Sequence, residues 1–260
     1  DLSSLIHILE KVNPDEIYNL AAQSHVRISF DVPIYTVQAD ALGVLNMFEA
    51  CRIVCPTAKI YQASSSEMFG NCIDEDGFQR ETTSMRPVSP YGCSKVFGFN
   101  IGRNYRHSYD MFISNGILFN HESPRRGSNF VTGKIVKGAW EIAQGKRTEL
   151  KLGNLEATRD WGHAKDYVEA MWMILQHNTP DDFVCSTGVS HTVRDCVEYV
   201  FERLGMDYRD YVVIDKRFFR PEELRDLKGD STKIRTELGW KPKYTFKTLM
   251  DDMIDEYDRN

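Results

Sequence analysis

The chain has 260 residues, of which 42% are hydrophobic and 27% are charged. This composition predicts a folded protein of one or two domains. With 32 Lys and Arg against 38 Asp and Glu, the formal net charge is -6, which excludes a polybasic surface for nucleic acid or anionic membranes. Charged residues interrupt the apolar stretches well short of the roughly 20 residues that a membrane-spanning helix needs.

The six cysteines are scattered along the chain, mostly within apolar segments. They form no CxxC pair and no zinc-ligand spacing with histidine. This usage indicates reduced core cysteines in a cytoplasmic protein, and we expect no metal site.

Short apolar strands alternate with longer amphipathic helices through the first half of the chain. The pattern predicts helices over residues 2–12, 41–54 and 91–109, and strands over residues 16–22, 59–64 and 112–119. Strands separated by helices at this spacing pair in parallel through crossover connections. We therefore expect an α/β fold with a doubly wound, Rossmann-type parallel sheet.

The character of the sequence changes after residue 120. A polar loop over 121–129 precedes a predicted helix over 130–145, then a short strand and loop within 150–162, a helix over 163–177, a strand over 183–187 and a helix over 192–205. The Thr192 to Asp195 spacing is typical of a capping box. We expect a sheet domain over 1–120 and a smaller α/β domain over 121–260, with some elements crossing back to the sheet domain.

No glycine-rich dinucleotide fingerprint occurs in the chain, which opens with Asp1 rather than Met. A Rossmann-type sheet normally begins with a strand and a glycine-rich turn whose N–H groups hold a pyrophosphate. We therefore expect that the first βαβ portion, and with it part of a cofactor site, is missing from the N-terminus.

Tyr91 and Lys95 form the sharpest local motif, because a four-residue spacing places both on one helix face. A nearby ammonium favours the phenolate: lowering the phenol pKa from about 10 to 7 takes roughly 4 kcal/mol. One unit charge at about 4 Å supplies that much at an effective dielectric constant of about 20. The pair can therefore act as a base, although an exposed helix pair has the same spacing.

Ser65 and Glu67 end the strand upstream of this motif. Strand periodicity places them on the same side, at the carboxyl end where open α/β sheets bind ligands. A hydroxyl and a carboxylate there suit proton abstraction beside a carbonyl. The alternative is that the Ser-Ser-Ser-Glu run simply caps a helical turn.

At these residues the chain resembles the extended short-chain dehydrogenases/reductases, and within them the GDP-mannose 4,6-dehydratases. The resemblance runs in order through nearly the whole chain. It is carried by YNLAAQSHV (18–26), YQASSSEMFG (61–70), SPYGCSK (89–95), NGILFNHESPRRG (115–127), LGN (152–154), RDWGHAKDYV (159–168), FRPEE (219–223) and LGWKP (238–242). The family usually has Thr where Ser65 stands, which keeps the hydroxyl.

The resemblance implies a lyase that converts GDP-mannose to GDP-4-keto-6-deoxymannose with NADP, acting as a homodimer or homotetramer. Tyr91 would take the proton of the sugar 4-hydroxyl, and Lys95 would lower the Tyr91 pKa and hold the nicotinamide ribose. Ser65 would hydrogen-bond the C4 oxygen. Glu67 would remove the C5 proton and protonate the departing 6-hydroxyl.

The resemblance also implies binding residues for the cofactor and the nucleotide-sugar. The cofactor set is Leu20, Ala21, Ala22, Gln23, Ser24, Tyr35, Lys95, His121 and Arg126. The substrate set is Ser24, Asn120, Lys134, Gly153, Arg159, Arg220 and Glu223. Arginines suit the two phosphates because of their fork geometry, although Arg159 could instead pair with Asp160 or Asp166. The loop with Arg125 and Arg126 would reach cofactor bound by a neighbouring subunit.

Other readings of the sequence stay open. Another nucleotide-sugar 4,6-dehydratase or an epimerase of the same family would share most of the motifs. The dehydratases acting on dTDP-glucose carry Asp–Glu where this chain has Ser66–Glu67, and an epimerase has no use for Glu67. A non-catalytic nucleotide-sugar-binding protein would not need the Tyr91 and Glu67 pair.

Overall fold

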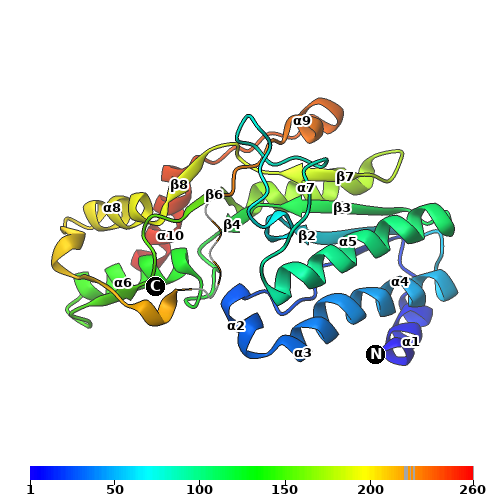
Figure 1. Cartoon of the computed structure of the whole chain (residues 1–260), viewed down its shortest axis with the longest axis horizontal. Helices are drawn as coiled ribbons and strands as arrows, with labels where there is room; N and C mark the ends of the chain where they lie inside the picture. Colours follow the sequence, from blue (N-terminus) through cyan, green and yellow to red (C-terminus); the bar gives the residue numbers. More distant parts are fainter. Residues whose placement is uncertain (220–221, 223, 225, 260) are drawn as a thin grey trace. The chain divides into compact units, whose positions relative to one another are not determined.

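The computed structural model describes residues 1–219, 222, 224 and 226–259 (Figure 1). The chain folds into two compact units. Unit 1 comprises Asp1–Leu118, Val168–Cys185 and Asp230–Trp240. Unit 2 comprises Phe119–Tyr167, Ser186–Gly229 and Lys241–Asn260.

Unit 1 is built on a four-stranded parallel sheet, which confirms the predicted α/β fold class. Its strands lie in the order β1 (Glu16–Asn19), β2 (Lys59–Ser65), β3 (Ile113–Leu118) and β7 (Asp182–Cys185). All six residues of β3 are buried, because a parallel sheet is covered on both faces. Ser65 lies opposite Leu118 at the carboxyl end of the sheet.

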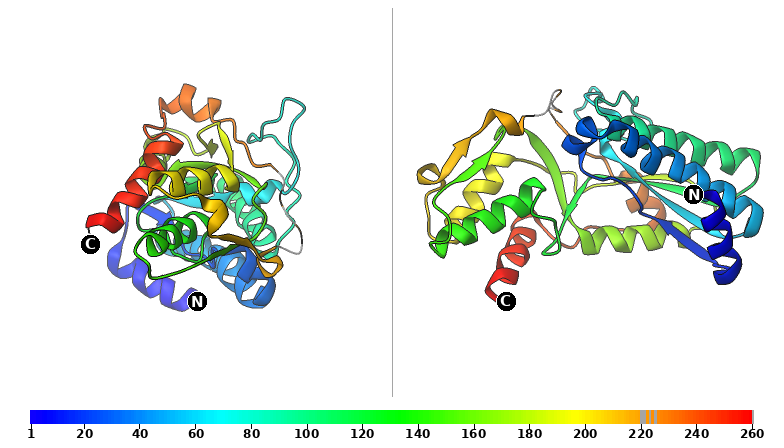
Figure 2. Two further views of the ribbon diagram at one scale, coloured as in Figure 1. Left: turned by 90° about the vertical axis from the view of Figure 1, so that its left-hand side faces the viewer. Right: turned by 90° about the horizontal axis from the view of Figure 1, so that it is seen from below.

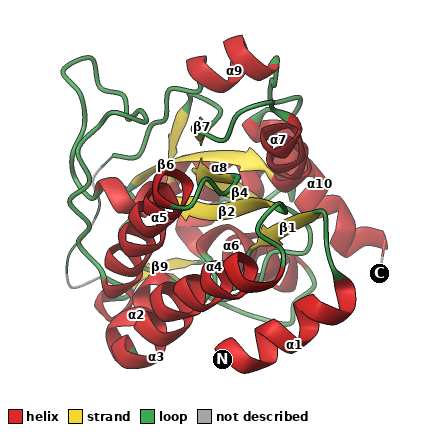
Figure 3. Ribbon diagram, turned by 90° about the vertical axis from the view of Figure 1, so that its right-hand side faces the viewer, coloured by secondary structure: helices red, strands yellow, loops and turns green. Residues whose placement is uncertain are grey.

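Helices cover both faces of this sheet (Figure 3). On one face lie α4 (Gly43–Val54) and α5 (Pro90–Ser108), with α1 (Leu2–Val12) against α4; α7 (Ala164–Gln176) lies on the other. The core between α1, α4, α5 and the strands contains Leu9, Phe48, Ile60, Tyr105 and Ile113.

The structure corrects three details of the predicted elements in unit 1. The strand predicted over 16–22 ends at Asn19, so the Leu20–Ser24 segment is a loop. A π-helical segment, Gln38–Leu42, precedes α4. Two short helices, α2 (Val26–Asp31) and α3 (Pro33–Val37), fill a region for which no element was predicted.

A loop over residues 71–86 contacts the rest of unit 1 through Arg80 and through Glu81, whose Oε1 accepts the Val184 N–H of β7 at 2.7 Å. The Arg80 guanidinium pairs with Asp74, Asp76 and Asp230. Asp230 also donates its backbone N–H to the Gln79 carbonyl at 2.9 Å. Short helix α9 (Thr232–Leu238) follows Asp230.

Unit 2 contains two small sheets and three packed helices. One sheet has the order β4 (Asn120–Glu122), β6 (Thr158–His163), β8 (Ser190–Thr192), and the other pairs β5 (Leu150–Leu152) with β9 (Val212–Ile214). Helices α6 (Val131–Ala143), α8 (Val193–Arg203) and α10 (Phe246–Arg259) pack together (Figure 2). The capping box predicted at Thr192 and Asp195 is confirmed at the start of α8.

Short 3-10 turns complete the fold, at Ser66–Phe69, Tyr208–Asp210 and Lys216–Phe218. All six cysteines are free thiols, and four of them are buried. Within the part of the chain that the structure describes, no helix has the length and apolar character to cross a bilayer.

Candidate active site

The four predicted catalytic residues gather at the carboxyl end of β2 in unit 1. Ser65 is the last residue of the strand, Glu67 lies in the 3-10 turn that follows, and Tyr91 and Lys95 lie in the first half of α5. None of the four side chains is more than 9% exposed. This burial limits their motion and keeps bulk water from their polar atoms.

The expected strand geometry at Ser65 and Glu67 was wrong. The strand ends at Ser65, whose Oγ accepts a hydrogen bond from the Glu67 N–H at 3.2 Å. The serine therefore caps the turn, as the alternative interpretation held, because its hydroxyl satisfies a backbone donor that the strand no longer pairs. The turn, rather than alternation along a strand, sets the position of Glu67.

Tyr91 and Lys95 share one face of α5, as their spacing predicted. The Lys95 Nζ lies 5.6 Å from the centroid of the Tyr91 ring. Ser89 caps the helix by accepting the Gly92 N–H at 3.0 Å, and Pro90 occupies the first turn, where it costs no hydrogen bond. The same Nζ donates to the Ala63 carbonyl of β2 at 3.0 Å, which ties the helix to the strand end.

Gly92 explains why α5 can approach the Glu67 turn so closely. A Cβ at this position would lie 2.9 Å from the Glu67 carbonyl oxygen and 2.9 Å from the Pro87 Cβ. Real Cβ contacts are longer than this, so only glycine fits without a shift of backbone. The sequence thereby places Tyr91 beside the turn that carries Glu67.

Two effects act on the pKa of Lys95 in opposite directions. Burial lowers the pKa of Lys95, and the charge of Asp40 in the π-helical segment acts in the opposite direction. Burial correspondingly raises the pKa of Asp40, against the charge of Lys95 and a hydrogen bond from Gln23. Two buried groups of opposite charge thus each favour the ionised form of the other.

The predicted cofactor loop, Leu20–Ser24, follows β1 at the same end of the sheet. Its Gln23 side chain folds back to accept the His25 N–H at 2.9 Å and to donate to Thr36 Oγ1 at 3.1 Å. Ala21 and Ala22 have side chains small enough to let a ligand approach the backbone. Tyr35, on α3, is 60% exposed, so its ring is available for a contact.

Two predicted cofactor residues, His121 and Arg126, lie in unit 2. The His121 ring stacks on Tyr167 with centroids 4.9 Å apart, and its Nδ1 lies 2.9 Å from the Phe119 carbonyl oxygen. Burial lowers the pKa of His121 to about 4, so the ring is neutral at pH 7. Arg126 forms an ion pair of 2.8 Å with the buried Glu122.

Three predicted substrate residues, Asn120, Lys134 and Gly153, lie in or near the two sheets of unit 2. Asn120 begins β4, and Lys134 lies on α6 with its Nζ 3.4 Å from the centroid of the Phe218 ring. Gly153 follows β5, where a Cβ would lie 3.0 Å from the Phe218 carbonyl oxygen. Phe218 therefore links Lys134 and Gly153 in one cluster.

Arg159 is 5% exposed, and its side chain hydrogen-bonds to backbone carbonyls of unit 2. Its Nη1 donates to the Thr158 carbonyl at 2.6 Å and to the Leu224 carbonyl at 3.2 Å. Neighbouring Asp160 accepts from Thr187 and Gly188 N–H groups at 2.9 and 2.8 Å. Two further predictions, Arg220 and Glu223, lie outside the described residues.

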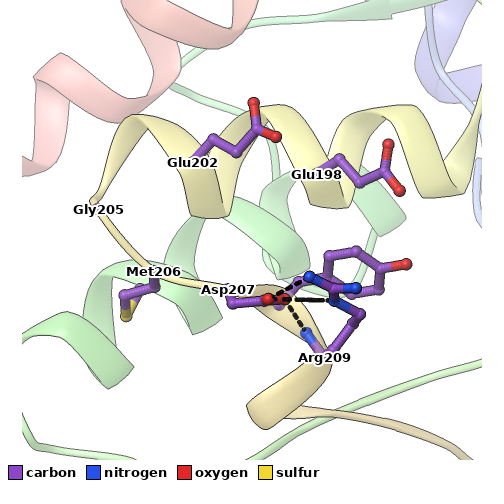
Figure 4. A pocket seen from close by; sticks show the side chains of 7 residues that line it. Glu198, Glu202, Gly205, Met206, Asp207 and Arg209 are labelled. Carbon is purple, nitrogen blue, oxygen red and sulfur yellow. Dashed lines mark hydrogen bonds and ion pairs between the residues drawn. The ribbon is translucent and has the colours of Figure 1, made fainter.

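One pocket of unit 2 contains none of the predicted residues (Figure 4). It lies at the end of α8 and is lined by Glu198, Glu202, Gly205, Met206, Asp207, Tyr208 and Arg209. The Arg209 guanidinium pairs with Asp207 at 2.5 Å, so its charge is already neutralised there. We assign this pocket no function.

Sequence reasoning overlooked several polar residues that surround the predicted set. Asp40 is the one charged residue of the mainly apolar stretch VQADALGVL (37–45), where a lone carboxylate was a usable signal. Glu122 precedes Arg126 by four residues, a spacing typical of ion pairs. Phe218 gave no signal, because its contacts with Lys134 and Gly153 join residues far apart in the sequence.

Comparison with known proteins agrees with this geometry. A family profile described as GDP-mannose 4,6 dehydratase matches residues 1–253. GDP-mannose 4,6 dehydratase 1 of Arabidopsis thaliana is 50% identical over 98% of this chain and 71% of its own length. GDP-mannose 4,6 dehydratase of Homo sapiens is 44% identical over 98% of this chain and 73% of its own length.

Solved structures show the fold class. RMD from Pseudomonas aeruginosa, complexed with NADPH, superposes with a TM-score of 0.89 at 21% identity over 100% of this chain and 86% of its own. DesIV, a dTDP-glucose 4,6-dehydratase from Streptomyces venezuelae with NAD and TYD bound, gives 0.87 at 22% identity over 100% and 77%. These superpositions show that the fold is a Rossmann-type α/β fold. By its sequence, the chain belongs to the GDP-mannose 4,6-dehydratase family, as the motifs predicted.

Proposed function

We propose that this protein converts GDP-mannose to GDP-4-keto-6-deoxymannose with NADP as its cofactor. The observation that carries the proposal is the buried set of Ser65, Glu67, Tyr91 and Lys95 at one strand end, in a chain of this family. Relatives named for this activity match nearly the whole chain.

The residues of unit 1 fit a nicotinamide dinucleotide. The Leu20–Ser24 loop follows a parallel strand at its carboxyl end, where open α/β sheets bind such ligands. The Lys95 ammonium and the exposed Tyr35 ring lie on neighbouring packed helices. A bound cofactor would supply the hydride acceptor for C4 of the sugar and, once reduced, the hydride donor for C6.

In the oxidation half-reaction, Tyr91 acts as the base. Its phenolate takes the proton of the 4-hydroxyl, and the Lys95 ammonium stabilises the phenolate. The Ser65 hydroxyl donates a hydrogen bond to the C4 oxygen. These three groups come from β2 and α5, which the hydrogen bond from Lys95 to the Ala63 carbonyl holds together.

In the elimination half-reaction, Glu67 acts first as base and then as acid. The new 4-keto group acidifies the C5 proton, which passes to the Glu67 carboxylate. Glu67 then protonates the departing 6-hydroxyl, which leaves as water. Because C6 finally gains a hydride, C5 must regain a proton, and protonated Tyr91 is the acid that balances the reaction.

The predicted binding residues complete the proposal. Leu20, Ala21, Ala22, Gln23, Ser24, Tyr35, Lys95, His121 and Arg126 are assigned to the cofactor. Ser24, Asn120, Lys134, Gly153, Arg159, Arg220 and Glu223 are assigned to the nucleotide-sugar. We also propose a homodimer or homotetramer, in which the Arg125–Arg126 loop contacts cofactor of a neighbouring subunit.

Substitution Glu67→Gln tests the assignment, because glutamine keeps the shape but cannot accept the C5 proton. Formation of 6-deoxy product should fall by about 10²–10⁴. The oxidation half-reaction should survive, so reduced cofactor should become visible by absorbance on mixing with GDP-mannose. The isosteric substitution Asp182→Asn, at a buried carboxylate of β7, is the matched control.

Two results would count against the proposal. Deoxy-sugar formation near the wild-type rate in Glu67→Gln would reduce the carboxylate to a structural group and leave an oxidoreductase or epimerase. Turnover of dTDP-glucose but not of GDP-mannose by the wild-type protein would assign a different substrate. Stoichiometric NADP(H), measured by the ultraviolet spectrum and mass of purified protein, distinguishes the enzyme from a non-catalytic binder.

A further inference from the structure

Asp40 is a buried carboxylate that the mechanism above does not use. It lies in the π-helical segment Gln38–Leu42, between α3 and α4, and its exposed fraction is 0%. Its Oδ2 has no hydrogen-bond partner among the described residues. An ionisable group is rarely kept in such surroundings without a role, because burial penalises its charge.

One contact of Asp40 reaches the loop assigned to the cofactor. Its Oδ1 accepts the backbone N–H of Gln23 at 2.6 Å. The Gln23 side chain closes the loop further through Thr36 and His25. The carboxylate therefore fixes the middle of the Leu20–Ser24 loop through a charge-assisted hydrogen bond, which is stronger than one between neutral groups.

A second, electrostatic link reaches the catalytic helix. The π-helical segment packs against α5, and a Cβ on Gly98 would lie 3.7 Å from the Asp40 carbonyl oxygen. Lys95 lies one turn before Gly98 on this helix. The Asp40 charge raises the Lys95 pKa against the effect of burial, so the two groups interact although they form no hydrogen bond.

The irregular helix explains how Asp40 can interact with both Gln23 and Lys95. A π-turn widens the helix by one residue and interrupts the regular hydrogen-bond ladder, and such turns are frequent at functional sites. Asp40 is the central residue of this turn. The backbone irregularity is therefore placed at the residue that links the loop to α5.

We propose that Asp40 is a positioning residue, whose carboxylate holds the cofactor loop through Gln23 and keeps the Lys95 ammonium charged. This inference rests on the proposed function for the meaning of both partners. Asp40 is not a catalytic residue, because it acts through Gln23 and Lys95 rather than on the reacting atoms. A single side chain thus couples cofactor binding to the base that starts the reaction.

Two substitutions separate the two roles in the full-length protein. Asp40→Leu removes both the hydrogen bond and the charge, whereas Asp40→Asn keeps an oxygen that can accept the Gln23 N–H. In Asp40→Leu, hydrogen exchange of the Gln23 amide in the ligand-free protein should accelerate by about fivefold to hundredfold, and NADPH affinity should weaken by a similar factor. In Asp40→Asn, both should stay within about threefold of wild type.

The pH profile of the oxidation half-reaction tests the charge. Elements packed against α5 carry other titratable groups, namely Arg27, Asp31, Tyr35, Glu49, Cys51, Arg52, Lys59, Tyr61 and Glu67. Asp40 is the one whose charge opposes the effect of burial on Lys95, and Tyr91 lies beside Lys95 on the same helix. Without the Asp40 charge the Lys95 ammonium loses its proton more readily, so the alkaline limb should move to lower pH in Asp40→Asn.

The substitution Asp182→Asn again serves as control, because this carboxylate lies on β7, the edge strand opposite β1, and pairs with Arg106 near the C-terminal end of α5, away from Lys95. It should change neither Gln23 exchange nor the pH profile. Wild-type exchange in Asp40→Leu, or an unmoved alkaline limb in Asp40→Asn, would overturn the proposal. If Asp40→Leu does not fold, the Asp40→Asn profile decides. Failure of the wild type to convert GDP-mannose would refute the proposed function and leave the exchange result standing.

Discussion

The two units hold their predicted residues in contrasting ways. In unit 1, the four candidate catalytic side chains come from one strand end, one turn and one helix, and all are buried. In unit 2, the described binding residues lie on β4, α6 and β6, in the loop between β4 and α6, and at the residue after β5. Chemistry on one bond needs a few groups at fixed separations, whereas a large ligand needs many groups over a wide surface.

Substitution Tyr91→Phe should separate catalysis in unit 1 from binding in unit 2 most clearly, because it should abolish activity without changing nucleotide affinity. Loss of the phenol removes the only group assigned to the 4-hydroxyl proton, so oxidation and product formation should both fall by at least about 10²–10⁴. Binding of GDP, measured by calorimetry, should stay near the wild-type affinity. Tyr105→Phe on the same helix, which loses a 2.8 Å hydrogen bond to Glu49, is the control; equal loss in both variants would contradict the assignment.

Substitution Arg159→Lys addresses the binding role of unit 2. Lysine keeps the charge but loses the fork that suits phosphate, so GDP affinity should fall by about 10–100-fold, with a smaller effect on kcat. Calorimetric titration measures the affinity. Arg194→Lys, at a solvent-exposed ion pair with Glu156, should leave it unchanged. Unaltered GDP affinity in Arg159→Lys would limit this arginine to holding the Thr158 and Leu224 carbonyls.

Substitution Gly92→Ala should strain the close approach of α5 to the Glu67 turn. The added methyl would meet backbone at 2.9 Å, and such overpacking costs typically about 1–3 kcal/mol. Urea unfolding measures the loss, and kcat should fall with it because Glu67 shifts. Gly102→Ala on the same helix adds a methyl at ordinary contact distance, 3.4 Å. If both variants lose equal stability, helix packing at Gly92 has no special role.

The pH dependence of the free energy of unfolding should reveal that the His121 ring is neutral in the folded protein. Its folded-state pKa, about 4, lies below the unfolded value of about 6.5. The stability that this neutral ring contributes is therefore complete above pH 6.5 and declines as the pH falls towards 4, by up to about 1.4 kcal/mol per pH unit. His121→Asn should remove this part of the pH dependence in urea unfolding, and an unchanged pH dependence in that variant would contradict the prediction.

Local rules predicted the elements that carry the candidate chemistry. Helical periodicity gave residues 2–12, which are the bounds of α1. The Thr192–Asp195 spacing gave the cap of α8, and the YxxxK spacing gave one face of α5. In each case the deciding interactions join residues at most four apart, so the sequence displays them directly.

Other parts of the site depend on contacts that no local pattern displays. The strand end at Ser65 could be read as continuing to Glu67, because the choice between strand and capped turn depends on the packing of α5 against the turn. Residues 26–37 lack a long apolar period and contain Pro33, so their two short helices are stabilised mainly by tertiary contacts. The partners of Asp40 lie 17 residues upstream and 55 residues downstream of it in the sequence.

The loop over 71–86 differs from the rest of unit 1 in what keeps it ordered. The sheet and its helices are held by apolar burial, whereas this loop relies more on polar contacts. The Arg80 side chain, which is 30% exposed, pairs with Asp74 and Asp76 within the loop and with Asp230 outside it. Glu81 accepts the Val184 N–H of β7 at 2.7 Å. Dissolved salt screens such partly exposed pairs and leaves apolar packing intact or strengthened. Raising the ionic strength should therefore weaken the Arg80 pairs while leaving the apolar core of unit 1 in place, so the salt concentration of the buffer acts mainly on this loop.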